Sequence, residues 1–391
     1  MMILKNCFLI SVLLISISFT NYVWGRTLPM DTPESVGMSS DRLKRVDRVI
    51  DESIKNKEIP GAVLLVSHKG KIVYKKAYGY RMVTPRQEKM TVDTIFDMAS
   101  ITKPMATASG IMLLVEDGKI RLQDPVAKYL PGFEVKGKAD VPVAYLLTHC
   151  SGLPAWDRYA TKNLDRDGII ADICSKDTAY EPGTKFVYSD LGFVLLGEII
   201  TRVSGVPENE FVAKNLYSRL GMEHTGYLPP DSWKAQCAAT EPRGGKMMQG
   251  EVHDPIAYAL KGVAGHAGLF STVDDMAVYF QMLLNGGVID GIRIYSPLTI
   301  REMTKNQSPV AARDYGFGWV IGTSYAGQRG DIFPRGGFGH TGWTGTSVWV
   351  DPTSQTFIVL LTNRVHPDGK GDAGRVRALV SNIVASSIMD E

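Results

Sequence analysis

The chain has 391 residues, of which 44% are hydrophobic and 21% charged, and its formal net charge at pH 7 is +2. This length allows one large core or two modest ones, with no need for a disulfide or a metal ion as support. The composition is that of a globular protein and not of a disordered one, and the small net charge gives no bulk attraction to nucleic acid or to an acidic surface.

The first residues are typical of a secretory signal peptide. Lys5 precedes an apolar run through residues 8–15. We predict a signal peptide over residues 1–25, cleaved after Gly25, and therefore an exported protein, periplasmic or secreted. An uncleaved membrane anchor is the alternative, but the strongly apolar part is shorter than the ~20 residues that a spanning helix requires. No permanent membrane span is expected.

From Arg26 onward the chain shows no linker and no repeat, which predicts one catalytic domain over residues 26–391. Apolar spacing predicts a helix that begins near Asp41 and ends before Pro60-Gly61. A β-hairpin follows, with strands at residues 62–66 and 72–74. Residues 101–299 are rich in helical periodicity and loops, and the clearest predicted helices there are 105–115 and 191–203.

Strand-forming sequence returns near the C-terminus, at residues 316–321, 345–350 and 356–361, before a last helix over residues 374–387. Strands at both ends with helices between them predict an α+β fold, in which one antiparallel sheet is flanked by helices and carries an inserted, mostly helical lobe. We assign the sheet lobe to about residues 26–100 and 300–391, and the helical lobe to about residues 101–299. A cleft between the lobes is the expected place for a site.

The first chemical motif is Ser-x-x-Lys, formed by Ser100 and Lys103 at the start of an apolar helix. Residues three apart share a helix face, so the hydroxyl and the amine can meet. Pro104 is tolerated in the first turn only, which places Ser100 at or near the helix N-terminus. There, the helix dipole and burial disfavour an ammonium, so that Lys103 can accept the serine proton. The alternative is a plain N-cap at Ser100 with Lys103 in solvent.

Two further motifs occur downstream, each of which also has a structural reading. Tyr188 precedes Ser189-Asp190 at the start of another apolar helix, where it can reach a cleft or simply be half-buried beside a helix cap. The glycine-rich segment 339–345 stands where strands resume. Such an edge lets a substrate approach and leaves N–H groups free for an oxyanion, although a tight hairpin is the alternative.

In this order, the three motifs resemble the serine β-lactamase-related family, of the class C β-lactamase and DD-peptidase type. The resemblance extends over nearly the whole chain after the leader, and includes Leu146-Leu147-Thr148-His149-Cys150-Ser151-Gly152 and Gly268-Leu269-Phe270-Ser271. Segments 250–254, 263–268 and 339–346 are most similar to the penicillin-binding protein 4B branch, which is described as periplasmic D-alanyl-D-alanine carboxypeptidases.

The resemblance implies a covalent mechanism in which Ser100 is acylated, Lys103 accepts its proton and Tyr188 shares the proton transfer. It also implies that the substrate is bound by Asp190, His340, Thr341, Gly342 and Trp343. His340 stands where most relatives carry the lysine of a Lys-Thr-Gly triplet, so recognition of a substrate carboxylate is expected to be weaker or pH-dependent. Asp190 stands where many relatives carry asparagine, and it is able to pair with Lys103. Backbone N–H groups of Ser100 and Trp343 are the expected oxyanion hole.

The sequence therefore predicts an exported serine hydrolase acting on a small-molecule or peptide substrate, most of all a D-alanyl-D-alanine carboxypeptidase. A carboxylesterase or weak β-lactamase, and a non-catalytic penicillin or peptide sensor, are the alternatives. No cofactor and no metal site are expected, because no acidic and histidine cluster has ligand spacing. Structural roles are expected for His149, His253 and His266. Three cysteines remain after the leader, and one disulfide is possible among them: Cys150, Cys174 and Cys237.

Overall fold

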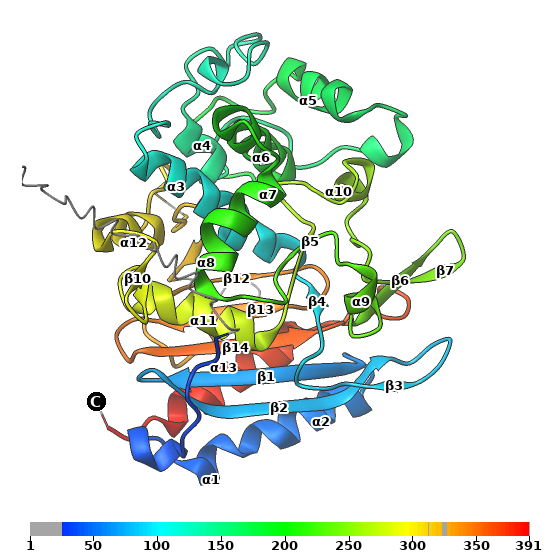
Figure 1. Cartoon of the computed structure of the whole chain (residues 1–391), viewed down its shortest axis with the longest axis vertical. Helices are drawn as coiled ribbons and strands as arrows, with labels where there is room; N and C mark the ends of the chain where they lie inside the picture. Colours follow the sequence, from blue (N-terminus) through cyan, green and yellow to red (C-terminus); the bar gives the residue numbers. More distant parts are fainter. Residues whose placement is uncertain (1–25, 312, 323–326, 391) are drawn as a thin grey trace, which may run out of the picture.

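The computed structural model describes residues 26–311, 313–322 and 327–390. The predicted signal peptide lies outside these residues. No helix within the described part of the chain is long and apolar enough to cross a membrane. Figure 1 shows a sheet with helices on both of its faces. The described chain begins at Arg26, whose amide donates to the Gly221 carbonyl oxygen after α8, and it ends on the sheet side of the molecule.

The main sheet is antiparallel and joins the two ends of the chain. The N-terminal hairpin pairs with the C-terminal strands through β1 and β14, with Leu64 opposite Leu360 and Leu65 opposite Val359. Among the described residues its spatial order is β11 (Val320–Ile321), β12 (Phe338–Thr341), β13 (Ser347–Asp351), β14 (Thr356–Thr362), β1 (Gly61–His68), β2 (Lys71–Met82), β3 (Glu88–Lys89). The predicted antiparallel sheet flanked by helices is thereby confirmed.

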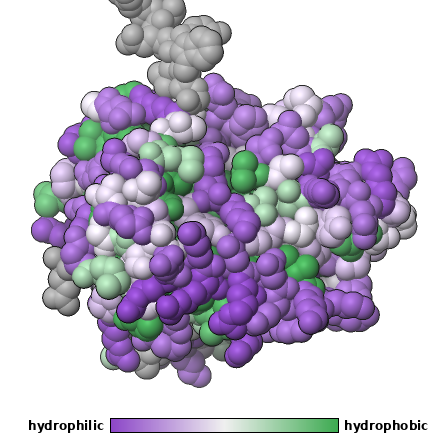
Figure 2. Space-filling model, turned by 90° about the horizontal axis from the view of Figure 1, so that it is seen from below, coloured by the Kyte–Doolittle hydropathy of each residue, from purple (hydrophilic) through white to green (hydrophobic). Residues whose placement is uncertain are grey.

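Three helices cover the outer face of this sheet, at the bottom of Figure 1: α1 (Ser40–Leu43), α2 (Arg45–Lys55) and α13 (Gly374–Ser387). The single helix predicted from Asp41 is therefore two helices, which meet at Lys44, while Ser39 caps the first by accepting from the Arg42 amide at 3.3 Å. The last helix has the predicted bounds. Seen from below in Figure 2, this face is mostly hydrophilic, with apolar residues in small separate groups.

The other face carries the middle of the chain. Helix α11 (Val273–Leu284) packs directly on β1 and β14, and most of the remaining helices lie above it in Figure 1, with α9 at its level on the right. These helices are α3 (Ser109–Glu116), α4 (Val143–Leu147), α5 (Arg166–Ser175), α6 (Asp190–Ser204), α7 (Glu208–Val212), α8 (Ser218–Leu220), α9 (Asp231–Lys234), α10 (Pro255–Ala259) and α12 (Pro297–Thr304). Small sheets accompany them: β4 (Phe96–Asp97), β8 (Leu269–Ser271) and β5 (Gly226–Tyr227); β6 (Ala239–Arg243) and β7 (Lys246–Gln249); β9 (Val288–Ile289) and β10 (Ile292–Arg293).

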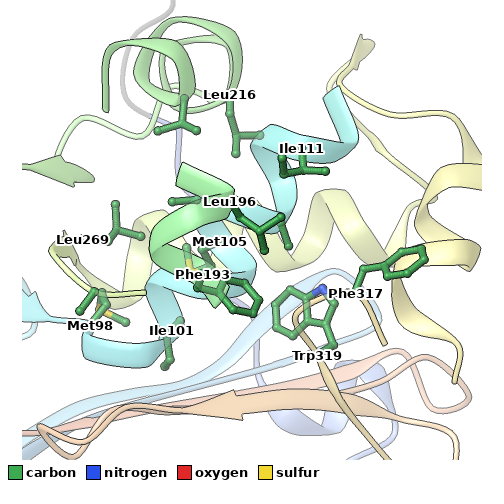
Figure 3. Packing of buried hydrophobic residues seen from close by; sticks show 14 of the residues in the cluster. Met98, Ile101, Met105, Ile111, Phe193, Leu196, Leu216, Leu269, Phe317 and Trp319 are labelled. Carbon is green, nitrogen blue, oxygen red and sulfur yellow. The ribbon is translucent and has the colours of Figure 1, made fainter. Parts of the chain in front are cut away.

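Two hydrophobic cores lie on opposite faces of the main sheet. Side chains alternate along a strand, so Leu64 belongs to the core beneath α2 and α13, whereas Leu65 belongs to the core beneath the helices of the middle segment. Figure 3 shows part of the second core, where Met98, Ile101 and Met105 pack near Phe193 of α6. The sheet is therefore buried on both faces, which explains why β1 is buried at every residue.

The strand predicted over residues 316–321 was too long. Only Val320–Ile321 pairs with β12, because Gly318 has a φ of +76°, which turns the chain before it. A Cβ at Gly318 would come within 2.9 Å of the Ala108 Cβ, so this turn packs closely on the helix that follows Ser100. Residues 315–319 consequently form a bent segment beside the functional residues.

Candidate active site

The nucleophile candidate lies where three kinds of helix follow one another. Ser100 is in a 3-10 turn (Ala99–Ile101), Lys103 begins a π-helical segment (Lys103–Ala108), and α3 continues from it. Ala99 has a φ of +45°, which is strained for a residue with a side chain, and its amide donates to Asp97 Oδ1 at 2.8 Å. This bend leaves Ser100 partly exposed while both of its neighbours are buried.

Lys103 is fully buried and donates to three acceptors. Its Nζ lies 3.0 Å from Ser100 Oγ, 2.7 Å from Asp190 Oδ1 and 3.2 Å from the His266 carbonyl oxygen. An ammonium has three protons, so all of them have acceptors. Asp190 therefore pairs with Lys103, as the sequence allowed. For Lys103 to take the serine proton, it must first give up one of its own, and Asp190 is the nearest base.

The Tyr-Ser-Asp motif brings three different contacts to the site. Ser189 is the N-cap of α6, since its Oγ accepts from the Gly192 amide at 3.2 Å. The Tyr188 ring lies 4.8 Å from Lys103 Nζ, a cation–π distance, and stacks at 4.3 Å on the His149 ring. The two readings of this motif are thus compatible, because Ser189 caps the helix while its neighbour Tyr188 contacts Lys103.

The glycine-rich segment closes against the nucleophile. Gly342 is required by close approach: a Cβ there would lie 2.5 Å from the Met98 carbonyl oxygen. Thr344 and Thr346 donate to the carbonyls of Asp97 and Met98, at 2.7 and 3.1 Å. These bonds fix the turn after β12 beside Ser100. The Trp343 amide has no acceptor in the described part of the chain, and the Ser100 amide lies in the first turn of its helix, where amides have no intrahelical partner.

These residues line one pocket of about 430 Å³. Its walls are Ser100, Tyr188, His340, Thr341, Gly342, Trp343, Arg364, Gly371, Asp372 and Arg377. A larger cavity of about 590 Å³ lies elsewhere, near Tyr258 and Leu228, but it contains none of the catalytic candidates. Chemistry rather than volume therefore selects the site.

His340 is buried and uses both ring nitrogens within the protein. Nδ1 lies 2.8 Å from the Thr341 carbonyl oxygen, and Nε2 lies 3.2 Å from the Tyr315 hydroxyl. Burial, and then the nearby charge of Lys103, lower the pKa of His340 to about 3. At neutral pH His340 is therefore uncharged.

Positive charge enters the pocket from two arginines that the sequence motifs did not indicate. Arg364 stacks on the exposed Trp343 ring at 4.4 Å and donates to the carbonyls of Trp343 and Gly371, at 2.7 and 2.9 Å. Arg377 is buried and donates to the carbonyls of Gly342 and Thr346. No acidic side chain of the described residues forms a salt bridge with Arg364 or Arg377, although Asp372 lines the same pocket.

The three histidines for which a structural role was expected are all hydrogen-bonded within the protein. His266 Nε2 lies 2.7 Å from Asp254 Oδ1, and His253 Nε2 lies 2.5 Å from Glu241 Oε2. His149 Nδ1 accepts from the Ser189 amide at 3.0 Å. The cysteines Cys150, Cys174 and Cys237 are all free and buried, so no disulfide joins them.

Comparison with known proteins identifies the family. The family model described as Beta-lactamase matches residues 46–381. A protein of Salmonella heidelberg (strain SL476), described as "Putative D-alanyl-D-alanine carboxypeptidase", is 34% identical over 377 residues, which cover 86% of this chain and 85% of that protein. A protein of Salmonella enteritidis PT4 with the same description is 34% identical over 381 residues, covering 87% and 86% of the two chains.

Solved structures agree with this match. The octameric penicillin-binding protein homologue from Pyrococcus abyssi has a TM-score of 0.71 and 26% identity, and the match covers 88% of this chain and 78% of that one. EstCE1, a hydrolase with promiscuous acyltransferase activity, shares the fold with a TM-score of 0.72 at 23% identity, over 88% of this chain and 99% of that one. The predicted resemblance is thus confirmed, and the chain belongs to the beta-lactamase family.

Proposed function

We propose that this protein is an exported serine hydrolase that acts through an acyl-enzyme on Ser100, and that its substrate is a peptide ending in D-alanyl-D-alanine. The family and the description of its relatives support a hydrolase. The observation that carries the serine mechanism is the 3.0 Å hydrogen bond between Lys103 Nζ and Ser100 Oγ at the wall of an open pocket.

In the proposed mechanism Lys103 first passes one proton to Asp190. The resulting amine then takes the Ser100 proton, with Tyr188 sharing in the transfer, while Oγ forms a bond to the substrate carbonyl carbon. The amides of Ser100 and Trp343 stabilise the resulting oxyanion. Collapse of the tetrahedral intermediate breaks the peptide bond, and the departing D-alanine amine takes up the proton. Water then attacks the acyl ester, and Ser100 regains its hydroxyl.

The charges of the pocket support a substrate with a carboxylate. Arg364 has no salt-bridge partner among the described residues, and its Nη2 is left without an acceptor there. A guanidinium in this condition is suited to bind a carboxylate. A peptide that ends in D-alanine has one, whereas a simple ester does not.

The test is a substrate panel on the purified protein and on Ser100→Ala. We expect release of D-alanine from a diacyl-lysyl-D-alanyl-D-alanine peptide, slow turnover of nitrocefin, and a covalent mass increase with a fluorescent penicillin. Ser100→Ala is expected to lose the label and all turnover while keeping its melting temperature. Ser35→Ala, an exposed serine on the outer side of the sheet, is the control and should be labelled normally.

Other outcomes select the alternatives. Fast cleavage of nitrophenyl butyrate without release of D-alanine would replace the proposal by a carboxylesterase. Rapid nitrocefin turnover would favour a β-lactamase, and penicillin binding without any covalent mass increase would favour a sensor.

A further inference from the structure

A tyrosine outside the sequence motifs lies between two histidines of the site. The Tyr315 hydroxyl is 3.2 Å from His149 Nε2 and 3.2 Å from His340 Nε2. All three side chains are buried, with exposed fractions of 1% to 3%. His149 follows α4 in the middle segment and His340 is in β12 of the main sheet, so Tyr315 connects the two parts that form the pocket.

The hydrogen bonds of this group have one consistent direction. His149 Nδ1 accepts from the Ser189 amide, so in the neutral ring the proton is on Nε2, which donates to the Tyr315 hydroxyl. His340 Nδ1 faces the carbonyl oxygen of Thr341, which only accepts, so Nδ1 carries the proton of that ring. His340 Nε2 is then an acceptor, and the Tyr315 hydroxyl donates to it.

This arrangement resists protonation of His340. A second proton on His340 Nε2 would point at the Tyr315 oxygen, and the Tyr315 hydroxyl could then no longer donate to His340. The proton has no place on His149 either, because Nε2 of that ring is already a donor and Nδ1 is held by the Ser189 amide. Protonation of one ring therefore requires the whole group to rearrange.

The charged groups around His340 act in different directions. The Lys103 ammonium disfavours a second cation, and its partner Asp190 compensates part of that charge. Tyr188 stands 6.2 Å away, ring to ring. The pocket wall adds two more cations and one anion, from Arg364, Arg377 and Asp372.

We propose that Tyr315 is a positioning residue that holds His340 as the neutral Nδ1–H tautomer, so that the first position of the His-Thr-Gly triplet presents no charge to the substrate. This inference rests on the proposed function for its consequence in catalysis, but not for the tautomer itself. Because His340 stays neutral, the preference of the unaltered protein for carboxylate substrates over neutral esters does not change with pH in the range where a free histidine would titrate. Positive charge for the carboxylate then comes from Arg364.

The first experiment reads the tautomer directly. Nitrogen-15 NMR of histidine-labelled protein, with signals assigned by His340→Asn and His149→Asn, reports which ring nitrogen carries a proton. We expect a proton on Nδ1 of His340 and on Nε2 of His149, without titration of either ring between about pH 5 and 8. A proton on His340 Nε2, or a charged ring near about pH 6, would overturn the proposal whether or not the protein hydrolyses peptides.

The second experiment uses Tyr315→Phe, which removes the hydroxyl and keeps the ring. We expect the His340 ring to lose its single tautomer, so that its nitrogen-15 signals show a proton shared between Nδ1 and Nε2, because no hydroxyl then donates to Nε2. The ring should stay uncharged in the same pH range, since burial and Lys103 still lower its pKa. Tyr180→Phe is the matched control, since it removes a hydroxyl that donates to the His149 carbonyl and not to its ring. An unchanged His340 signal in folded Tyr315→Phe would contradict the role of Tyr315. If that variant did not fold, the tautomer measured in the unaltered protein would test the proposal.

Discussion

At the scale of single residues, positive charge reaches the pocket from Arg364 and not from His340, the first residue of the His-Thr-Gly triplet. His340 is neutral and hydrogen-bonded on both nitrogens, whereas Arg364 reaches the same pocket from the loop after β14. Its stacking on Trp343 and its two bonds to carbonyls hold the guanidinium in place. A fixed cation loses little entropy when it binds an anion, so Arg364 is well suited to carboxylate recognition.

We predict that Arg364→Gln raises KM for carboxylate substrates about tenfold and leaves kcat nearly unchanged, because the lost attraction acts on binding more than on the transition state. Steady-state kinetics on a D-alanyl-D-alanine peptide and on a neutral ester measure this. The ester should change by less than about twofold. Arg301→Gln, on the exposed side of α12, is the control. Equal losses on both substrates would show that Arg364 instead supports the oxyanion segment through its bond to Trp343.

The sequence allowed us to predict contacts between residues close together in the chain, but not the contacts between residues far apart in it. Ser100 and Lys103 are three residues apart, so helical geometry alone predicts that they meet. The pairing of Asp190 with Lys103 required the family pattern, since 87 residues separate them. Tyr315 directly precedes the strand predicted over residues 316–321 and belongs to none of the motifs. Nothing local distinguishes it as the link between His149 and His340.

At the scale of secondary structure, helix α7 begins with a buried carboxyl group, Glu208, which contacts Thr107 in the π-helical segment that begins at Lys103. Glu208 Oε1 lies 2.5 Å from the Thr107 hydroxyl, which also lies 2.6 Å from the Gly265 carbonyl oxygen. A carbonyl only accepts, so the single proton of Thr107 goes to Gly265, and Glu208 must be the donor to Thr107. Burial raises the pKa of Glu208 to about 7, in agreement with a protonated group. This contact supports the segment whose next residue, His266, accepts from Lys103.

The folded pKa of Glu208 lies above its unfolded value, so folding takes up a proton. The stabilisation is complete below about pH 4.3 and is lost as pH rises through about 7. We predict that the free energy of unfolding falls by about 1.4 kcal/mol per pH unit between about pH 4.3 and about pH 7 and levels off above that range, and that Glu208→Gln removes this contribution. Urea unfolding at a series of pH values measures it.

Glu210→Gln, on an exposed position of the same helix, should leave the slope in place. A slope that persists in Glu208→Gln would assign the pH dependence to another buried acid, such as Asp275, whose pKa is raised to about 6 by burial.

Among the predicted elements, those with one clear signal agree best with the structure. The last helix and the helix after Tyr188 carry strong apolar periodicity, and the second ends at Gly205 with a φ of +78°. The helix after Ser100 was predicted as regular, but it begins as a 3-10 turn and continues as a π-helix before α3. Apolar periodicity does not distinguish these helix types over one or two turns, so the sequence did not indicate the change.

At the scale of the whole molecule, the sheet couples the two cores. Along β1 and β14, successive side chains enter opposite cores. The last helix, α13, packs on the sheet to which the first hairpin belongs. The middle segment is also tied to it, because α11 packs on β1 and β14. If either core unfolded, the strands shared by both cores would be exposed on one face, and the other core would be destabilised.

Leu64 and Leu65 allow this coupling to be measured, since they are neighbours in β1, both fully buried, and face different cores. We predict that Leu64→Ala and Leu65→Ala each lower the free energy of unfolding by about 2–5 kcal/mol, and that each shifts one common transition. Calorimetry, together with thermal loss of penicillin labelling at Ser100, follows the whole molecule and the site at once. If the two cores unfolded separately, Leu64→Ala would split the heat-capacity peak and leave the labelling midpoint unchanged. A single peak that moves with the labelling midpoint in both variants is expected, because the pocket needs β12 and the helix of Ser100 in place together.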